Sequence, residues 1–405
     1  MVSIMIGVRS VTYQVPSVLT NQQEIGLLMA VANAWEKEAC HVHTQRISLP
    51  LLTEPVEIGS LVSWLSLCEV SGVRWLNVPI HPQGRNVIKM GKFALAALQY
   101  SGSIFVNVLG AVNAHFGQDV LRMYAKLNRQ VSGLDRTGQH NFRLGLSFNV
   151  AENGPFFPFT FAHVERPSFT IGLELVREFN EIISSLPQSD IVMMREGLLE
   201  AVAPQVEEIY ASAVKIATKY GMDFKGFDFS LAPEIGESGS IVPLLNCLGV
   251  YSFGSAGTMF ATAFWTDILK CMASRYPSVG FSGMMYSLLE DLDLCAINNE
   301  RGISLEHLMM LSTMCGCGLD MVPISGETSV EEIYALCLDI AGISCRLRKP
   351  LGIRLLPIPG VKRGQRAFTA INGEADFIAN TRVVPLNTNV LAAVGNDFSF
   401  MRYGT

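Results

Sequence analysis

The spacing of hydrophobic residues along this chain follows two patterns in turn, one typical of strands and one typical of helices. Short runs rich in Val, Ile, Leu and Phe are bounded by polar or Gly-containing turns, as is typical of strands, and longer stretches with helical spacing of apolar residues lie between them. The alternation continues almost from end to end, which predicts βα units around a parallel sheet. Continuously apolar runs such as 353–356 suit strands that are buried on both faces.

The pattern predicts ten strands and at least eight helices in an α/β fold. Ser329 is a credible helix cap because acidic residues follow it in the first turn. We expect a single domain over 1–405 and interpret the polar stretch 184–190 as a turn within it, with a division into two lobes as the alternative. The predicted strands are 2–8, 42–49, 74–78, 103–108, 142–149, 224–229, 249–253, 278–282, 319–323 and 353–358. The predicted helices are 21–39, 55–71, 117–131, 169–185, 191–220, 257–275, 304–314 and 329–343.

Composition narrows the classes of partner. The 405 residues are 49% hydrophobic and 16% charged, which is enough for a large core. A net charge of −6, with no basic cluster beyond 346–349, gives no basis for nucleic-acid or membrane-surface binding. The longest apolar runs are too short for a bilayer span, no signal peptide is recognisable, and the nine cysteines are an odd number, so we expect a cytoplasmic protein with reduced thiols. The expected partners are a small-molecule ligand and other copies of the chain, as a homo-oligomer and most simply a dimer.

A series of short segments carries a resemblance to a known family. They occur in a fixed order over most of the chain, and most densely from about 141 to 360. This order resembles the uncharacterised family called domain of unknown function 711 (DUF711, or uncharacterised protein family 0210). The segments are Pro-Phe-Phe-Pro at 155–158, 169–174, 228–233, 254–258, 290–291, 315–321 and 353–360.

The resemblance implies a ten-stranded α/β barrel similar to that of pyruvate formate-lyase and anaerobic ribonucleotide reductase, in agreement with the independent strand count. It implies no established activity. Glycyl-radical enzymes with this barrel carry a C-terminal Arg-Val-x-Gly-type segment, and the tail 383–405 offers Gly395 and Gly404 without that setting. We therefore reject radical chemistry for this chain.

Asp228 is the first candidate catalytic residue. It ends an apolar strand, where the loops of a barrel converge, and Ser230 and Ser238 in the following loop are candidate substrate ligands. The alternative interpretation is that Asp228 or Ser238 caps the next helix.

Glu290 and Asp291 form an adjacent acidic pair. Neighbouring carboxylates in a partly dry site repel, so that one can hold a proton while the other is ionised, or both can bind a divalent metal. Adjacent helix positions do not face each other, however, and a solvated pair explains the same two residues.

Cys315 is a candidate nucleophile in the segment Cys-Gly-Cys-Gly at 315–318. The family resemblance favours Cys315 over Cys317. A buried, unreactive thiol is the alternative. Gly254 and Gly257 precede an apolar helix, and their backbone N–H groups could receive an anion, although close packing of the helix explains the glycines equally well.

His163 and Glu174 are a candidate pair for proton transfer, with a hydrogen-bonded core histidine as the alternative. Arg354 lies within an apolar strand, and a buried guanidinium requires an acidic partner or an anionic ligand. Asp320 or a substrate carboxylate could meet that need.

Three functional hypotheses follow. The first is a non-radical enzyme that acts on a small anionic metabolite through an acidic site, used for acid–base chemistry or for a divalent metal, at the barrel mouth. The second is a non-catalytic regulatory protein that binds a metabolite, and the third is a mainly structural oligomer.

Overall fold

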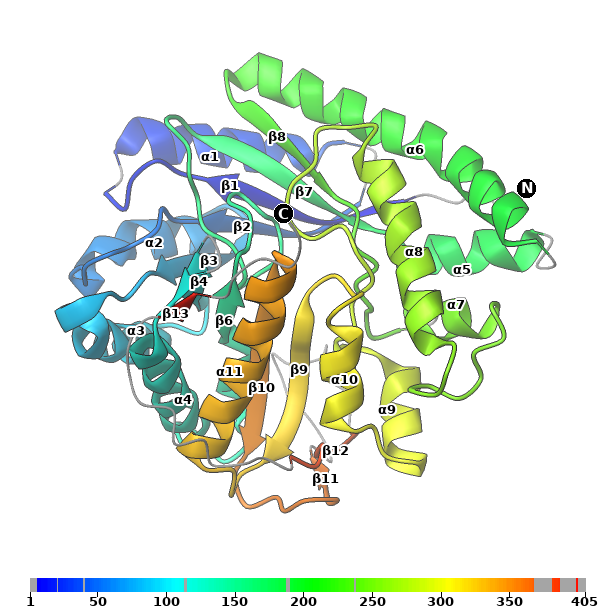
Figure 1. Cartoon of the computed structure of the whole chain (residues 1–405). Helices are drawn as coiled ribbons and strands as arrows, with labels where there is room; N and C mark the ends of the chain where they lie inside the picture. Colours follow the sequence, from blue (N-terminus) through cyan, green and yellow to red (C-terminus); the bar gives the residue numbers. More distant parts are fainter. Residues whose placement is uncertain are drawn as a thin grey trace.

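The computed structural model describes residues 6–19, 21–38, 41–112, 115–186, 190–236, 238–367 and 381–386, and the backbone of 398–399. Within these residues the fold is mixed α/β, as predicted, with one large sheet and helices along it (Figure 1). The strands are β1 Gly7–Gln14, β2 Val42–Ser48, β3 Val73–Ile80, β4 Ile104–Val112, β5 His115–Phe116, β6 Leu144–Phe148, β7 Ser168–Glu174, β8 Asp223–Asp228, β9 Gly318–Ser325, β10 Leu351–Ile358, β11 Arg366–Ala367, β12 Thr381–Arg382 and β13 Phe398–Ser399.

The helices connect successive strands and lie along the outer side of the curved sheet, from α1 and α2 through α4 and α11 to α8 and α6 (Figure 1). Several begin with a capping side chain: Asn21 caps α1, and Ser329 and Glu332 form a capping box at α11. The helices are α1 Gln22–Trp35, α2 Val62–Val70, α3 Val87–Tyr100, α4 Gln118–Ser132, α5 Val176–Ser185, α6 Ile191–Tyr220, α7 Val242–Asn246, α8 Thr258–Ala273, α9 Leu292–Glu300, α10 Leu305–Leu311 and α11 Val330–Leu347.

The direction of the strands divides the sheet into two blocks. Its main path has the order β8-β7-β1-β2-β3-β4-β6-β10-β9. Strands β1, β2, β3, β4 and β6 are mutually parallel, whereas β7 is antiparallel to β1 and β10 is antiparallel to β6. Strands β8 and β9 follow the direction of β7 and β10. The N-terminal ends of the first block therefore lie at the same edge of the sheet as the C-terminal ends of the second.

The segment 278–287 lies against both end strands of this path. Isolated parallel bridges join Phe227 to Ser278 beside β8, and Ser287 to Asp320 on β9. The predicted strand 278–282 thus takes part in pairing, but only through isolated bridges within the described residues.

The two faces of the sheet are covered differently. On one face, the side chains of Thr12 and Asn77 donate to the backbone carbonyls of Pro155 (3.3 Å) and Thr160 (2.8 Å), so the segment 150–163 lies against β1 and β3. On the other face, Gln45 donates to the carbonyl of Ala32 in α1 at 3.2 Å. Polar side chains of β1 and β3 can be buried on the first face because they donate hydrogen bonds to the backbone of the irregular segment 150–163.

Two predicted elements are wrong. The segment 249–253 is not a strand: it has Gly249 and Gly254 at positive φ at its ends and exposes Tyr251, and it has no pairing partner among the described residues. The predicted helix 169–185 is a strand followed by a helix, β7 and α5, because pairing with β1 overrides the helical spacing.

Other boundaries differ from the predictions. The first predicted strand, 2–8, lies mostly outside the described residues, and β1 continues to Gln14 through the polar residues that bond the 150–163 segment. The sequence pattern does not predict the helices α3, α7 and α9. The strands predicted at 42–49, 74–78, 103–108, 142–149, 224–229, 319–323 and 353–358 are confirmed within a few residues.

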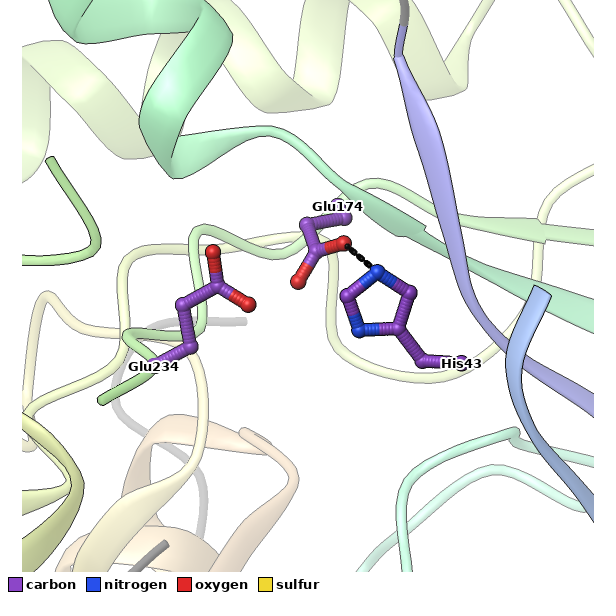
Figure 2. A group of neighbouring side chains, drawn as sticks. All are labelled: His43, Glu174 and Glu234. Carbon is purple, nitrogen blue, oxygen red and sulfur yellow. Dashed lines mark ion pairs between the residues drawn. The ribbon is translucent and has the colours of Figure 1, made fainter. Parts of the chain in front are cut away.

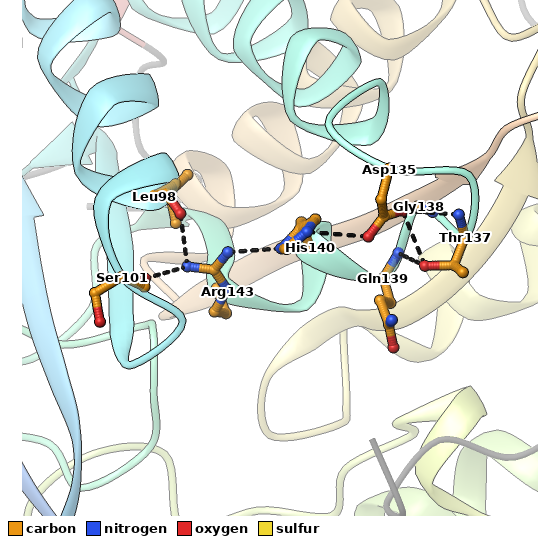
Figure 3. Close-up of polar contacts among 8 residues, drawn as sticks. All are labelled: Leu98, Ser101, Asp135, Thr137, Gly138, Gln139, His140 and Arg143. Atoms are coloured by element: carbon orange, nitrogen blue, oxygen red, sulfur yellow. Dashed lines mark hydrogen bonds and ion pairs between the residues drawn. The ribbon is translucent and has the colours of Figure 1, made fainter. Parts of the chain in front are cut away.

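Arg143 anchors the turn that leads into β6 (Figure 3). Its Nη1 donates to the carbonyl oxygens of Leu98 (3.0 Å) and Ser101 (2.8 Å) at the end of α3. His140 contacts Arg143 Nη2 through Nδ1 at 2.7 Å and Asp135 through Nε2 at 3.0 Å. A cation at the C-terminal end of α3 is favoured by the helix dipole, so this chain of contacts fixes the start of β6 beside the cavity described next.

Candidate functional site

A cavity of about 360 Å³ lies where the N-terminal ends of β1 to β4 meet the C-terminal ends of β7 and β8. One part of its wall is aromatic and the rest carries opposite charges. Aromatic lining comes from Trp75, Phe105, Phe142, Phe156, Phe157, Phe159 and Phe281, and charged lining from Arg9, Arg46, Arg74, Arg354, Glu174, Glu234, Glu290 and Asp320, with His41 and His43 beside them.

Three side chains from separate elements form what we call the His-Glu-Glu cluster: His43, Glu174 and Glu234 (Figure 2). His43 lies on β2, Glu174 is the last residue of β7, and Glu234 lies in the loop after β8. His43 Nε2 is 2.7 Å from Glu174 Oε2, and one donor atom from each residue lies within 4.8 Å of the others. The antiparallel pairing of β1 with β7 places Glu174 opposite Gly7, next to β2.

The two carboxyl groups of the cluster differ in protonation. Burial alone would raise the pKa of Glu174, but hydrogen bonds with His43 and Glu234 outweigh it and lower that pKa. Burial, and then the hydrogen bond and charge of Glu174, raise the pKa of Glu234 to about 7. The hydrogen bond between Glu174 and Glu234 requires a proton on Glu234, because no other donor among the described residues reaches the buried Oε1 of Glu174. The pair therefore shares one proton near neutral pH.

The cluster can do chemistry in two ways. An imidazole beside a carboxylate, with a second, protonated carboxyl group, is able to accept and return a proton. One nitrogen and two carboxylate donors also suit a borderline divalent ion such as Zn²⁺ or Mn²⁺. Arg177 Nη2 lies 3.0 Å from Glu234 Oε1, so a cation already balances part of the negative charge.

Glu178 on α5, near this cluster, makes the free energy of unfolding depend on pH. Burial is the main reason that its pKa rises from 4.5 to about 7. Because the folded-state pKa is raised, the stability associated with the protonated group is present below pH 4.5 and is lost as the pH rises through 7. We expect Glu178→Gln to raise the free energy of unfolding by about 2 kcal/mol more at pH 8 than at pH 4.5. Urea titrations at both pH values would test this.

Glu181→Gln is the matched control for Glu178→Gln, because Glu181 is exposed on the same helix. This control should give the same small change at both pH values. An equal effect of Glu178→Gln at the two pH values would contradict the prediction.

Arg46 enters the cavity from β2 and is 7% exposed. Its Nε donates to Thr44 Oγ1 at 2.9 Å, and its Nη1 donates to the carbonyl of Pro155 at 3.2 Å. The guanidinium carbon lies 4.8 Å from the ring centroid of Trp75 and 5.4 Å from that of Phe157. Burial, and next the charge of Arg9, lower the pKa of Arg46 to about 9. The rings of Trp75 and Phe157, the hydroxyl of Thr44 and the carbonyl of Pro155 thus stabilise its charge.

Arg354 lies in the same cavity with a different set of partners. Its Nε and Nη2 donate to the two carboxylate oxygens of Asp320 at 2.6 and 2.8 Å, and Nη2 is 3.6 Å from Glu290 Oε2. Burial would lower the pKa of Arg354, but the two carboxylates outweigh it and raise that pKa. Arg354 therefore meets acidic partners supplied by the chain itself, as the sequence suggested for Asp320.

Four of the residues singled out in the sequence line this cavity: Glu174, Glu290, Asp320 and Arg354. Asp291 points elsewhere, since it caps α9 by accepting from the backbone of Asp293 and Leu294. The acidic pair is thus divided between the cavity and a helix cap.

Asp228 and Ser230 are not among the cavity-lining residues. The fully buried carboxylate of Asp228 accepts from Ser230 N (2.8 Å) and Ser230 Oγ (2.6 Å), and from the backbone of Phe281 (2.7 Å) and Ser282 (3.0 Å). It therefore ties the end of β8 to the segment 278–287.

The remaining candidates lie outside the cavity lining. Cys315 is fully buried, and burial raises the pKa of its thiol; it is Cys317 that reaches the cavity, also with its pKa raised by burial. The eight described cysteines are free. His163 is exposed and pairs with Glu152 at 3.0 Å.

Gly254 and Gly257 have positive φ before α8, which explains their glycine identity through backbone geometry. Ser238, also at positive φ, is exposed, and its carbonyl accepts from Asn180.

Sequence reasoning missed His43, Arg46 and Arg9 and did not assign a role to Glu234. For Arg46 a weaker signal existed: it is an arginine inside a predicted strand, 42–49, but that strand is largely polar, unlike the apolar strand that drew attention to Arg354. His43 and Glu234 carried no such signal, because their meeting depends on strand order.

The fold and the cavity define a mixed α/β protein with an aromatic-walled cavity that carries both positive and negative side chains. The sequence model of the family "Uncharacterised ACR (DUF711)" matches residues 56–369, and the chain belongs to this family. Glu174, Glu234, Glu290, Asp320 and Arg354 lie inside the matched range.

Curated relatives carry the family name UPF0210. The chain is similar to the UPF0210 protein of Pyrobaculum arsenaticum, with 26% identity over 226 residues, 55% of this chain and 50% of that protein. It is also similar to those of Syntrophobacter fumaroxidans (29% identity, 63% of this chain and 57% of the other) and Ligilactobacillus salivarius (25%, 69% and 63%). The chain thus spans about half to 63% of the length of these relatives. Among the described residues, none of the helices combines the length and apolar character that a membrane span requires.

Proposed function

We propose that this protein is a non-radical enzyme that acts on a small anionic metabolite in the cavity, with the His-Glu-Glu cluster as its proton-transfer site. The single observation that carries the proposal is the position of Glu174. Its buried carboxylate lies between an imidazole, at 2.7 Å, and a second carboxyl group whose pKa is near 7, on the wall of a cavity with aromatic lining. Groups poised in this way are able to exchange a proton with a bound molecule.

The cluster supports a division of roles. Glu174, held ionised by His43, acts as the base or fixes the tautomer of the imidazole. Glu234, protonated below about pH 7, acts as the acid. A substrate anion is balanced by the arginines on the same wall, Arg9 and Arg46.

We also propose that the sheet closes as a ten-stranded barrel of the pyruvate formate-lyase type. Strands β1, β2, β3, β4 and β6 would form one half. The other half, which runs in the opposite direction, would be formed by β7, β8, β9 and β10, with the segment 278–287 between β8 and β9. The isolated bridges of that segment to both end strands support this closure.

A thermal-shift screen of the full chain against carboxylates, amino acids, phosphates and divalent metals, followed by NMR of any bound compound on long incubation, tests the function. A ligand of the folded state raises the melting temperature. We expect a bound anion to be converted, and Glu174→Gln to slow the conversion by about 100-fold or more while binding changes by less than about threefold. Glu152→Gln is the matched control, because Glu152 contacts an exposed histidine outside the cavity lining.

The other outcomes distinguish the alternatives. A stabilising anion that is never converted would reject the enzyme and favour the metabolite-binding regulator. A shift produced by a divalent metal and lost in both Glu174→Gln and His43→Ala would replace proton transfer with a metal site at the same residues.

A further inference from the structure

Arg46 differs from its neighbour Arg354 in one respect that points to a ligand. Both guanidinium groups are buried, at 7% and 6% exposed, and both line the cavity. Arg354 is matched by Asp320 and Glu290, whereas no carboxylate of the described residues lies within ion-pair distance of Arg46. Glu290 attracts Arg46 only from beyond that distance. A buried charge without a counter-charge in contact is costly, and an anion supplied from outside would lower that cost.

The contacts of Arg46 also fix its orientation. The guanidinium lies near the rings of Trp75 and Phe157, and Thr44 and the Pro155 carbonyl hold Nε and Nη1. No hydrogen bond from Nη2 to the described residues is found, so Nη2 remains available on the terminal edge of the group. A planar, restrained guanidinium edge matches the two oxygens of a carboxylate.

Arg9 adds a second positive charge to the wall of the cavity and makes hydrogen bonds of its own. Its Nη1 and Nη2 donate to the carbonyls of Ala232 and Pro233, both at 3.0 Å. The charge of Arg9 is one of the causes that lower the pKa of Arg46, which means that two cations repel each other across this part of the cavity. An anion between them would relieve the repulsion.

From this geometry we infer that Arg46 is the carboxylate-binding residue of the cavity, and that its ligand is a small carboxylic acid with an apolar or aromatic body. The seven aromatic side chains of the wall favour such a body, and the volume of about 360 Å³ admits a small molecule. The inference rests on the proposed function and defines its substrate class. Phosphate esters are the competing anions, and the experiment separates them from carboxylates.

The test measures dissociation constants of four probes for the full chain by titration calorimetry: benzoate, acetate, phenyl phosphate and the neutral benzamide. We expect benzoate to bind at least tenfold more tightly than each of the other three. Arg46→Met should weaken benzoate at least 30-fold and Arg46→Lys about tenfold, because lysine keeps the charge and loses the planar edge. Arg122→Met is the matched control: that guanidinium lies 4.0 Å from the Tyr334 ring centroid, outside the cavity lining, and benzoate affinity should change less than twofold.

The melting temperature of each ligand-free variant shows separately whether it folds. The ligand-free Arg46→Met protein should melt within a few degrees of the parent, since it removes an unmatched buried charge. If it fails to fold, Arg46→Lys carries the test. Unchanged benzoate affinity in the folded variants, tighter binding of phenyl phosphate, or the absence of benzoate binding would each overturn the inference. Failure of the proposed function is distinguishable, because it appears as a carboxylate that binds through Arg46 and is never converted.

Discussion

Asp320→Asn is expected to lower the free energy of unfolding by about 3 kcal/mol, because it breaks a buried, bidentate ion pair from one side. Among the described residues, Arg354 would then keep Glu290, at 3.6 Å, as its charged partner. Arg354→Met should be at least as harmful, since it leaves two carboxylates buried together. Urea denaturation of each variant gives the measurement.

A double variant distinguishes the ion pair from simple loss of packing. Asp320→Leu combined with Arg354→Met should lose less stability than Asp320→Leu alone or Arg354→Met alone, because no unmatched charge remains on that pair. The exposed pair of Arg166 and Asp223 is the control, and Asp223→Asn should cost less than about 1 kcal/mol. Equal costs for Asp320→Asn and Asp223→Asn would contradict the expectation.

Asp228→Asn is the second change with a large expected effect, about 2–3 kcal/mol of unfolding free energy. Its two carboxylate oxygens accept four hydrogen bonds, and an amide would turn a donor toward N–H groups that need an acceptor. Because burial raises the pKa of Asp228, the ionised group depends on these donors. The backbone N–H groups of Phe281 and Ser282 should exchange with solvent faster in the variant.

Ser230→Ala is the matched control for Asp228→Asn, since it leaves the carboxylate in place and removes the hydroxyl, which donates to Asp228 and accepts from the backbone N–H of Gly283 at 3.3 Å. It should cost about 1 kcal/mol. Hydrogen exchange at residues 281–282 should stay close to that of the parent in this control. A variant Asp228→Asn with parental exchange at these amides would show that Asp228 does not hold the segment 278–287 against β8.

Several residues of the candidate site could be recognised from the local sequence alone. Arg354 was recognisable as a buried cation because a charge inside an apolar strand is costly wherever that strand lies, and its partner Asp320 comes from the adjacent strand. That argument does not extend to Arg46, because the sequence of β2 is largely polar and only the tertiary structure shows that Arg46 is buried. Glu174 was chosen as a proton-transfer residue, but with His163 in place of His43.

The sequence by itself determined the α/β class, most of the strands and helices, and the family, because periodicity and local motifs depend on near neighbours. Only the tertiary structure decided which charges meet. The contact of His43 with Glu174 requires the parallel pairing of β1 with β2 and the antiparallel pairing of β1 with β7. The same arrangement bound Asp228 to backbone amides and, among the residues that the structure describes, brought no carboxylate within ion-pair distance of Arg46. Such contacts join residues far apart in the chain, and their free energies depend on a burial that no local pattern specifies.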